Sequence, residues 1–161
     1  MTLSMPLKFA GVAALFFSSL LFGLTKIREQ RRRLTETKAV AALVHQIRTE
    51  IEAFRRPLPE IYAVYRSDVL EDNGFLPRLR SGGLTEAIPA LAHLPDVAAI
   101  LIPLAERLGQ GDAAEEVGRC RIAEEGLLAL SVSYEKDSAS VEKLYRTIPV
   151  MMAASAALIL L

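Results

Sequence analysis

The chain has 161 residues, with 19 lysines and arginines against 19 aspartates and glutamates, so its formal net charge is zero. This length fits one domain with its attachments, the single cysteine excludes a disulfide within the chain, and the charge balance argues against a nucleic-acid-binding protein. A mean hydropathy of +0.29 beside 24% charged residues indicates that apolar and charged residues occupy separate segments.

The first apolar segment predicts a transmembrane helix over residues 7–27. Phe9 to Thr25 contains no charged residue, and as a helix it would extend about 25 Å, close to a bilayer core of about 30 Å. A cleaved signal peptide is disfavoured, because the positive charge follows the apolar segment and no small-residue cleavage site ends it. By the positive-inside rule, the basic residues that follow place the downstream side in the cytoplasm; attraction to anionic headgroups is a second role for them. We call these residues the membrane collar: Lys26, Arg28, Arg31, Arg32 and Arg33.

Residues 28–147 carry apolar positions at helical spacing, which predicts an all-α cytoplasmic domain, an antiparallel bundle of about six helices. The first long helix continues from the membrane helix and ends at Arg56, because Pro57 and Pro59 follow. Pro59 suits the first turn of a second helix over residues 60–70. The apolar stripe of the first helix steps by four and three residues in turn: Val40, Val44, Ile47, Ile51 and Phe54.

Turn-forming residues divide the next part of the chain into short helices. A turn at 71–74 precedes a short helix at 75–80, and residues 81–83 break the chain. Thr85 is expected to cap a helix over 86–93, and Asp96 to cap another over 97–108, with a kink at Pro103 or two shorter helices there. Gly109 then supplies a left-handed stop.

The last helix is predicted to run from Asp112 into the C-terminal apolar segment. Asp112 and Glu115 have the form of a capping box. Every seventh residue from Ala113 is apolar, which predicts a coiled-coil-like seam that packs on the first long helix. Residues 148–161 predict a hydrophobic C-terminal helix and membrane segment, although so short a stretch could instead be buried in the bundle. If both ends insert, both termini lie on the side opposite the helical domain.

No group of residues has the spacing of a catalytic or metal site, so the sequence predicts no enzyme, no cofactor and no small-molecule substrate. His45 and His93 each lack a second histidine or cysteine at metal spacing. Cys120 falls on the apolar seam, which favours a buried side chain over a nucleophile. The adjacent glutamates at 115–116 and at 124–125 point about 100° apart on a helix and are expected to be solvated.

Two segments resemble a known family, the stage III sporulation protein AB of endospore-forming bacteria. Thr49-Glu50-Ile51 followed by Pro57-Leu58-Pro59-Glu60 is similar to the family's Glu-Thr-Glu-Ile and Thr-Pro-Leu-Pro-Glu-Ala stretch. Leu108-Gly109 with Asp112 is similar to its Leu-Gly-x-x-Asp-x-x-x-Gln element. The chain departs from the family at Arg56, where Thr is usual, and at Glu116, where Gln is usual.

The resemblance implies a sporulation membrane protein whose helical domain is similar to the cytoplasmic domains of the F platform proteins of type II secretion. In the outer forespore membrane of the mother cell, it would be a scaffold that anchors a secretion-type ATPase beside other stage III membrane proteins, in the channel complex to the forespore. An alternative is a helical membrane signalling or assembly factor unrelated to sporulation. Residues in and beside two turns are the candidate partner-binding site, with a purely local structural role as the competing interpretation: Glu50, Arg55, Pro57, Pro59, Glu60, Leu108, Gly109 and Asp112.

Overall fold

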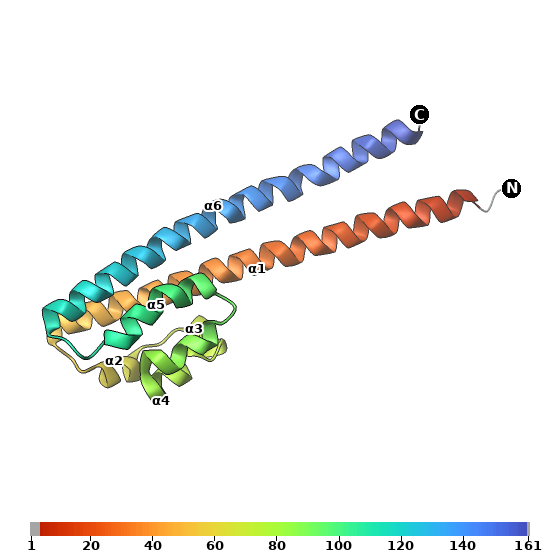
Figure 1. Cartoon of the computed structure of the whole chain (residues 1–161). Helices are drawn as coiled ribbons and strands as arrows, with labels where there is room; N and C mark the ends of the chain where they lie inside the picture. The colour runs from red at the N-terminus through yellow and green to blue at the C-terminus, as the bar shows by residue number, and fades with distance from the viewer. Residues whose placement is uncertain (1–3, 161) are drawn as a thin grey trace. The chain divides into compact units, whose positions relative to one another are not determined.

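The structure, a computed structural model, describes the backbone of residues 4–160 and the side chains of residues 25–140 and of Lys143. The described residues contain helices and no strand, which confirms the all-α prediction, and Figure 1 shows the helices along the chain. They comprise six α-helices and one short 3-10 helix, η1: α1 Ser4–Phe54, α2 Leu58–Val64, α3 Asp68–Asp72, α4 Phe75–Ala87, η1 Ile88–Leu91, α5 Pro95–Arg107 and α6 Ala113–Leu160.

The described residues form two compact units. The first unit consists of α1 through Arg32 and of α6 from Lys136 onward, and the second unit is Arg33–Glu135. The predicted membrane segments, 7–27 and 148–161, lie outside the residues whose side chains are described, apart from residues 25–27. Among the described residues, no helix combines the length and the apolarity that crossing a membrane requires.

The core of the second unit is built from one face of α1 and from the short helices, with α4 in contact with α2, α3, η1 and α5. On α1 the predicted stripe is buried from Val40 through Ile51. Phe54, the last predicted position of that stripe, is instead 67% exposed. The helix ends at this residue, and the Arg56 guanidinium lies over the ring, 5.7 Å from its centroid. The apolar stripe therefore stops one turn before the helix does.

The seam predicted on the last helix is buried within the second unit. Of the positions seven residues apart, Cys120, Leu127 and Tyr134 are buried and Ala113 is half-buried, and Ala123 is also buried. Lys38 pairs with Glu135 at 3.2 Å, whereas Arg48, further along α1, pairs with Glu124, earlier on α6, at 2.8 Å. The two helix segments of this unit therefore run antiparallel, as the sequence predicts.

The single helix predicted over 60–70 is wrong, because the structure has two helices there, α2 and α3. Tyr65 and Ser67 between them have extended backbones, with ψ of 138° and 114°. Arg80 holds this break, since its guanidinium donates to the carbonyl oxygens of Tyr62 and Tyr65, at 3.4 and 3.1 Å, and pairs with Glu71 at 2.9 Å. Because Arg80 is distant in the sequence, helical spacing within 60–70 carries no sign of it.

The region around α4 also differs from its prediction. Within α4, Gly83 has a non-helical backbone with φ 78° and ψ −168°, so two helical segments meet there at a kink. Residues 88–91 form η1 and not part of a helix capped by Thr85. The predicted break at 81–83 is therefore confirmed, and it lies at the last of these residues.

The α5 helix starts earlier than predicted and is not interrupted. Its N-cap is Leu94, so Asp96 lies in the first turn, where its carboxylate accepts a hydrogen bond from the Tyr134 hydroxyl at 2.9 Å. Pro103 lies inside the helix and produces neither a break nor a second helix. The carbonyl that loses its donor to this proline belongs to Ala99, which is exposed to solvent, so water can bond it.

Candidate functional site

The first motif-bearing turn, residues 55–60, starts where α1 ends. Arg55 has a left-handed backbone with φ 48°, a conformation that costs a non-glycine residue about 1–2 kcal/mol. Its N–H donates to Ile51 O at 3.1 Å, which satisfies one of the last helical carbonyls. Pro57 follows with an extended backbone and leads into α2. Four predicted site residues of this turn are exposed: Arg55, Pro57, Pro59 and Glu60.

Glu50, the remaining predicted residue of this motif, faces inward. Its Oε1 accepts a hydrogen bond from Gln46 Nε2 at 2.8 Å, and its Oε2 lies 3.1 Å from Arg56 Nη1. The second contact has the distance of an ion pair, but Oε2 has no hydrogen bond of good geometry within the described residues. The Glu50 side chain is 14% exposed and lines a small cavity of about 180 Å³ together with Arg56 and Arg66. Its carboxylate therefore ties the turn to α1.

The second motif-bearing turn, residues 108–112, links α5 to α6. Gly109 has φ 89° and is the left-handed stop that the sequence predicts. Asp112 caps α6, because its Oδ1 accepts the N–H of Glu115 at 2.8 Å. The predicted reciprocal half of the capping box is wrong, since the Glu115 carboxylate pairs with Arg119 at 2.9 Å.

Glu116 holds the second turn from inside the unit. Its Oε1 accepts hydrogen bonds from the N–H groups of Gly109 and Gly111, at 2.8 and 2.9 Å, and lies 3.5 Å from Arg119 Nη1. Glu116 is only 5% exposed, and its Oε2 has no hydrogen-bond partner among the described residues. The expectation of a solvated glutamate is wrong here, because position 116 lies seven residues before the buried Ala123 and shares its face.

The structure brings the two motif-bearing turns together. A Cβ placed on Gly109 would lie 3.3 Å from Leu58 Cδ1, so the turns are in contact. Tyr62, on α2, is buried, and this burial, with the nearby Cys120 and Glu116, raises its pKa. Leu108 packs half-buried against the core. We call the exposed predicted residues of the two turns the paired-turn surface: Arg55, Pro57, Pro59, Glu60, Gly109 and Asp112.

The membrane collar is a separate group. Its residues through Arg32 belong to the first unit, whereas the paired-turn surface belongs to the second. Lys26 pairs with Glu29 at 3.6 Å, with both side chains about half exposed. Arg33 starts the second unit, and its carbonyl accepts a hydrogen bond from the Thr37 hydroxyl at 2.8 Å.

Sequence reasoning missed a carboxylate that joins α1 to α6. Glu124 Oε1 and Oε2 bond His45 Nδ1 and Arg48 Nε, each at 2.8 Å. Burial by itself would raise the pKa of Glu124, but the hydrogen bonds from His45 and Arg48 and the Arg48 charge outweigh burial and lower it. The expectation of a solvated side chain is wrong for Glu124, which is 15% exposed. Its position four residues after Cys120, on nearly the same face, is the signal that could have revealed it.

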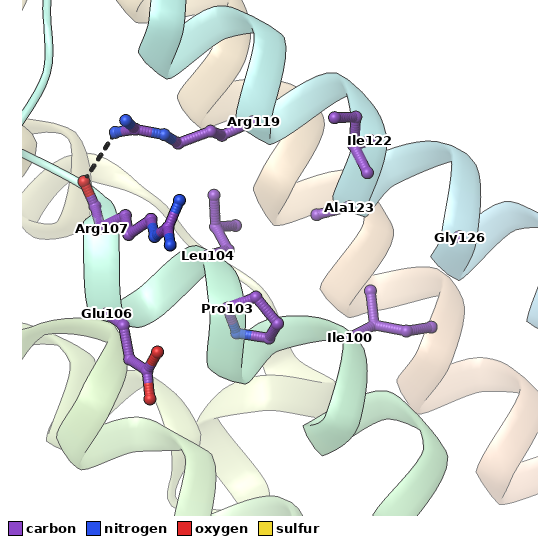
Figure 2. Close-up of a pocket in the computed structure, with 9 residues that line it drawn as sticks. All are labelled: Ile100, Pro103, Leu104, Glu106, Arg107, Arg119, Ile122, Ala123 and Gly126. Carbon is purple, nitrogen blue, oxygen red and sulfur yellow. Dashed lines mark hydrogen bonds between the residues drawn. The ribbon is translucent and has the colours of Figure 1, made fainter.

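A groove of about 460 Å³ lies between α5 and α6, and Figure 2 shows its lining. At one end Arg119 Nη1 donates to Arg107 O at 3.0 Å. Toward the other end, a Cβ on Gly126 would lie 3.4 Å from Ile100 Cγ2, so the helices approach closely there. Ile122, on the α6 wall, is 73% exposed. No pattern in the sequence had marked these residues as a site.

Two further features concern metal-binding and nucleophilic side chains. Among them, no group of three or more histidine, cysteine or carboxylate side chains is placed to hold a metal ion. Burial, with the nearby Glu116, raises the pKa of the Cys120 thiol to about 11, so this thiol is protonated at neutral pH. His93 bonds the buried Glu36 and so links the segment before α5 to α1. Comparison with models of protein families, with curated proteins and with solved structures found no match.

Proposed function

We propose that the chain is a non-enzymatic scaffold, anchored in a membrane by its apolar ends, that holds a cytosolic secretion-type ATPase through the paired-turn surface. By its resemblance to the stage III sporulation protein AB family, the assembly is the channel complex between mother cell and forespore. The observation that carries the proposal is the contact between the two family-like motifs, at Leu58 and Gly109. Segments about fifty residues apart in the sequence supply one exposed surface.

The chemistry of the paired-turn surface supports protein contact. Pro57 and Pro59 restrict the backbone, so little conformational entropy remains to be lost on binding. Arg55 and Glu60 offer one exposed charge of each sign for pairing with a partner. Beside them, the exposed Phe54 ring lies under a guanidinium, and aromatic and arginine side chains are the types enriched at the centres of protein interfaces.

The anchoring part of the proposal rests on the distribution of apolar and basic residues. The uncharged segments at 9–25 and 148–161 flank the charged helical region, and the membrane collar follows the first of them. The positive-inside rule then puts the helical domain in the cytoplasm, which is where an ATPase would meet the paired-turn surface.

The test is recovery of the secretion-type ATPase with the full chain after co-expression and detergent extraction. Reversing charge in Arg55→Glu and Glu60→Lys is expected to reduce ATPase recovery at least tenfold, which corresponds to about 1.4 kcal/mol or more of binding energy. Both side chains are exposed, so far-UV circular dichroism is expected to keep its helical signal.

Matched controls come from exposed charges elsewhere in the second unit. Arg78→Glu and Glu86→Lys make the same charge changes on α4, and these variants are expected to recover the ATPase as the unaltered chain does. If reversal at 55 and 60 leaves recovery unchanged, the paired-turn surface is not the contact. If the unaltered chain recovers no ATPase, the scaffold function itself is refuted.

A further inference from the structure

One buried residue, Glu116 of α6, lies next to both motif-bearing turns. Its Oε1 accepts the N–H groups of Gly109 and Gly111 in the second turn, at 2.8 and 2.9 Å. Glu116 is near α2 as well, since burial, with the nearby Cys120 and Glu116, raises the pKa of Tyr62 on that helix. The Glu116 side chain is only 7% exposed, so it lies beneath the surface that the two turns present.

The second turn contains two glycines, so the side chains within it constrain its backbone little. A glycine backbone has the widest choice of conformations. The contact with Leu58 of α2, whose Cδ1 would lie 3.3 Å from a Cβ on Gly109, is apolar and has no preferred direction. Hydrogen bonds are directional. The two bonds to Glu116 Oε1 therefore set where these N–H groups, and Asp112 directly after Gly111, lie beside α2.

We propose that Glu116 is a positioning residue for partner binding, which holds Gly109 and Asp112 at the place beside α2 where the ATPase contacts the paired-turn surface. Glu116 itself does not touch the ATPase. This inference rests on the function proposed above, and it adds a residue outside the contact surface that sets the shape of that surface. The requirement is for an oxygen at the Oε1 position more than for a charge, because the ion pair of Oε1 with Arg119 is long, at 3.5 Å, and Arg119 pairs more closely with Glu115, at 2.9 Å. Glutamine supplies such an oxygen, whereas alanine does not.

The test is recovery of the secretion-type ATPase with the full chain after co-expression and detergent extraction. Glu116→Ala is expected to lower recovery about tenfold, which corresponds to about 1.4 kcal/mol of binding energy, because the second turn loses the bonds that place it. Glu116→Gln is expected to recover the ATPase as the unaltered chain does. Amide hydrogen exchange at Gly109 and Gly111 is expected to accelerate in the alanine variant alone. If Glu116→Ala does not fold, as judged by far-UV circular dichroism, Glu116→Asp takes its place, since it draws the oxygens back by one methylene group.

Leu127→Ala is the control that separates positioning from stability. Leu127 is fully buried on the same helix and lies eleven residues after Glu116, which is about 16 Å further along the helix axis. Cutting a buried leucine to alanine lowers the stability of a core substantially, so this variant is expected to lower the urea midpoint at least as much as Glu116→Ala does and to keep the recovery of the ATPase.

Three outcomes overturn the positioning role while the unaltered chain still recovers the ATPase and the scaffold function stands. They are unchanged recovery in Glu116→Ala, an equal loss of recovery in Glu116→Gln, and an equal loss of recovery in Leu127→Ala. If the unaltered chain recovers no ATPase, the scaffold function is refuted and the positioning role is refuted with it.

Discussion

Replacing Glu116 tests whether one buried carboxylate organises the turn between α5 and α6. Its Oε1 accepts the N–H groups of Gly109 and Gly111, and its Oε2 is buried without a hydrogen-bond partner among the described residues. Glu116→Ala removes both bonds. Glu116→Gln keeps an oxygen for these two N–H groups, removes the charge and replaces Oε2 with an amide NH2 group.

The two variants should differ in stability by an amount that can be worked out from these contacts. Two hydrogen bonds to a charged acceptor contribute about 3–6 kcal/mol in total, and burying an unpartnered oxygen costs about 1–3 kcal/mol. Gly109 and Gly111 are exposed, so water can partly replace the carboxylate. Glu116→Ala should therefore lower the free energy of unfolding by about 2–4 kcal/mol, whereas Glu116→Gln should change it by about 1 kcal/mol or less.

The assay is urea unfolding of the full chain in detergent, followed by near-UV circular dichroism, to which the buried Tyr62 contributes. Amide hydrogen exchange at Gly109 and Gly111 gives a local measure, and it should accelerate in Glu116→Ala only. Glu115→Ala is the control, since that side chain is 61% exposed and makes a surface ion pair, which contributes about 1 kcal/mol at most. The reasoning is refuted if Glu116→Gln lowers the free energy of unfolding as much as Glu116→Ala does. It is also refuted if Glu116→Ala lowers it no more than Glu115→Ala does.

Two further predictions concern backbone conformation and pH, both measured by the same unfolding assay. Gly109→Ala should lower the free energy of unfolding by about 1–2 kcal/mol, because φ 89° is strained for alanine. Gly118→Ala should raise it by about 0.5–1 kcal/mol, because a Cβ at this position of α6 meets nothing within 4 Å. Equal effects of the two substitutions would contradict this account. The lowered pKa of Glu124 means that the folded state binds this proton less tightly than the unfolded state, so its stabilisation holds above pH 4.5 and is lost as pH falls below that value. Glu124→Ala should weaken this dependence of stability on acid pH, whereas Glu125→Ala, at the exposed neighbour, should keep it. Parallel curves of stability against pH for the unaltered chain and both variants would count against the prediction.

Repeating patterns made the long helices predictable. The buried stripe on α1 and the heptad positions on α6 depend on residues close together in sequence, so spacing alone identified them. Gly109 was predictable for a similar reason, since a glycine after a helical run needs only local backbone geometry to explain it. The Asp112 cap is likewise a bond to a residue three positions away.

Contacts between distant residues were not predictable. The break between α2 and α3 depends on Arg80, which bonds the carbonyls of Tyr62 and Tyr65, and helical spacing within the segment carries no trace of it. The roles of Glu116 and Glu124 were missed because carboxylates were assumed to be solvated. Each lies on the buried face of α6, where specific donors make burial favourable.

The candidate site was predictable in its parts and not in its assembly. The two turns were identified from prolines, a glycine and a cap, all of which are local features. Their contact through Leu58 and Gly109 depends on how α2 packs beside the α5–α6 turn. Glu50 illustrates the same limit, because the motif placed it in the site while its side chain turns inward toward Gln46 and Arg56.

The burial of Cys120 has a practical consequence for thiol chemistry on this chain. Maleimides react with thiolates, and a fully buried thiol whose pKa is raised to about 11 offers almost none at neutral pH. The unaltered chain should therefore give almost no maleimide labelling, and single cysteines can be introduced for mapping without first replacing Cys120. Ser81, exposed on α4, suits such a reporter better than Arg80, whose guanidinium fastens the break between α2 and α3. If the proposed membrane anchoring holds, labelling with a reagent that cannot cross a bilayer would report the side on which α4 lies.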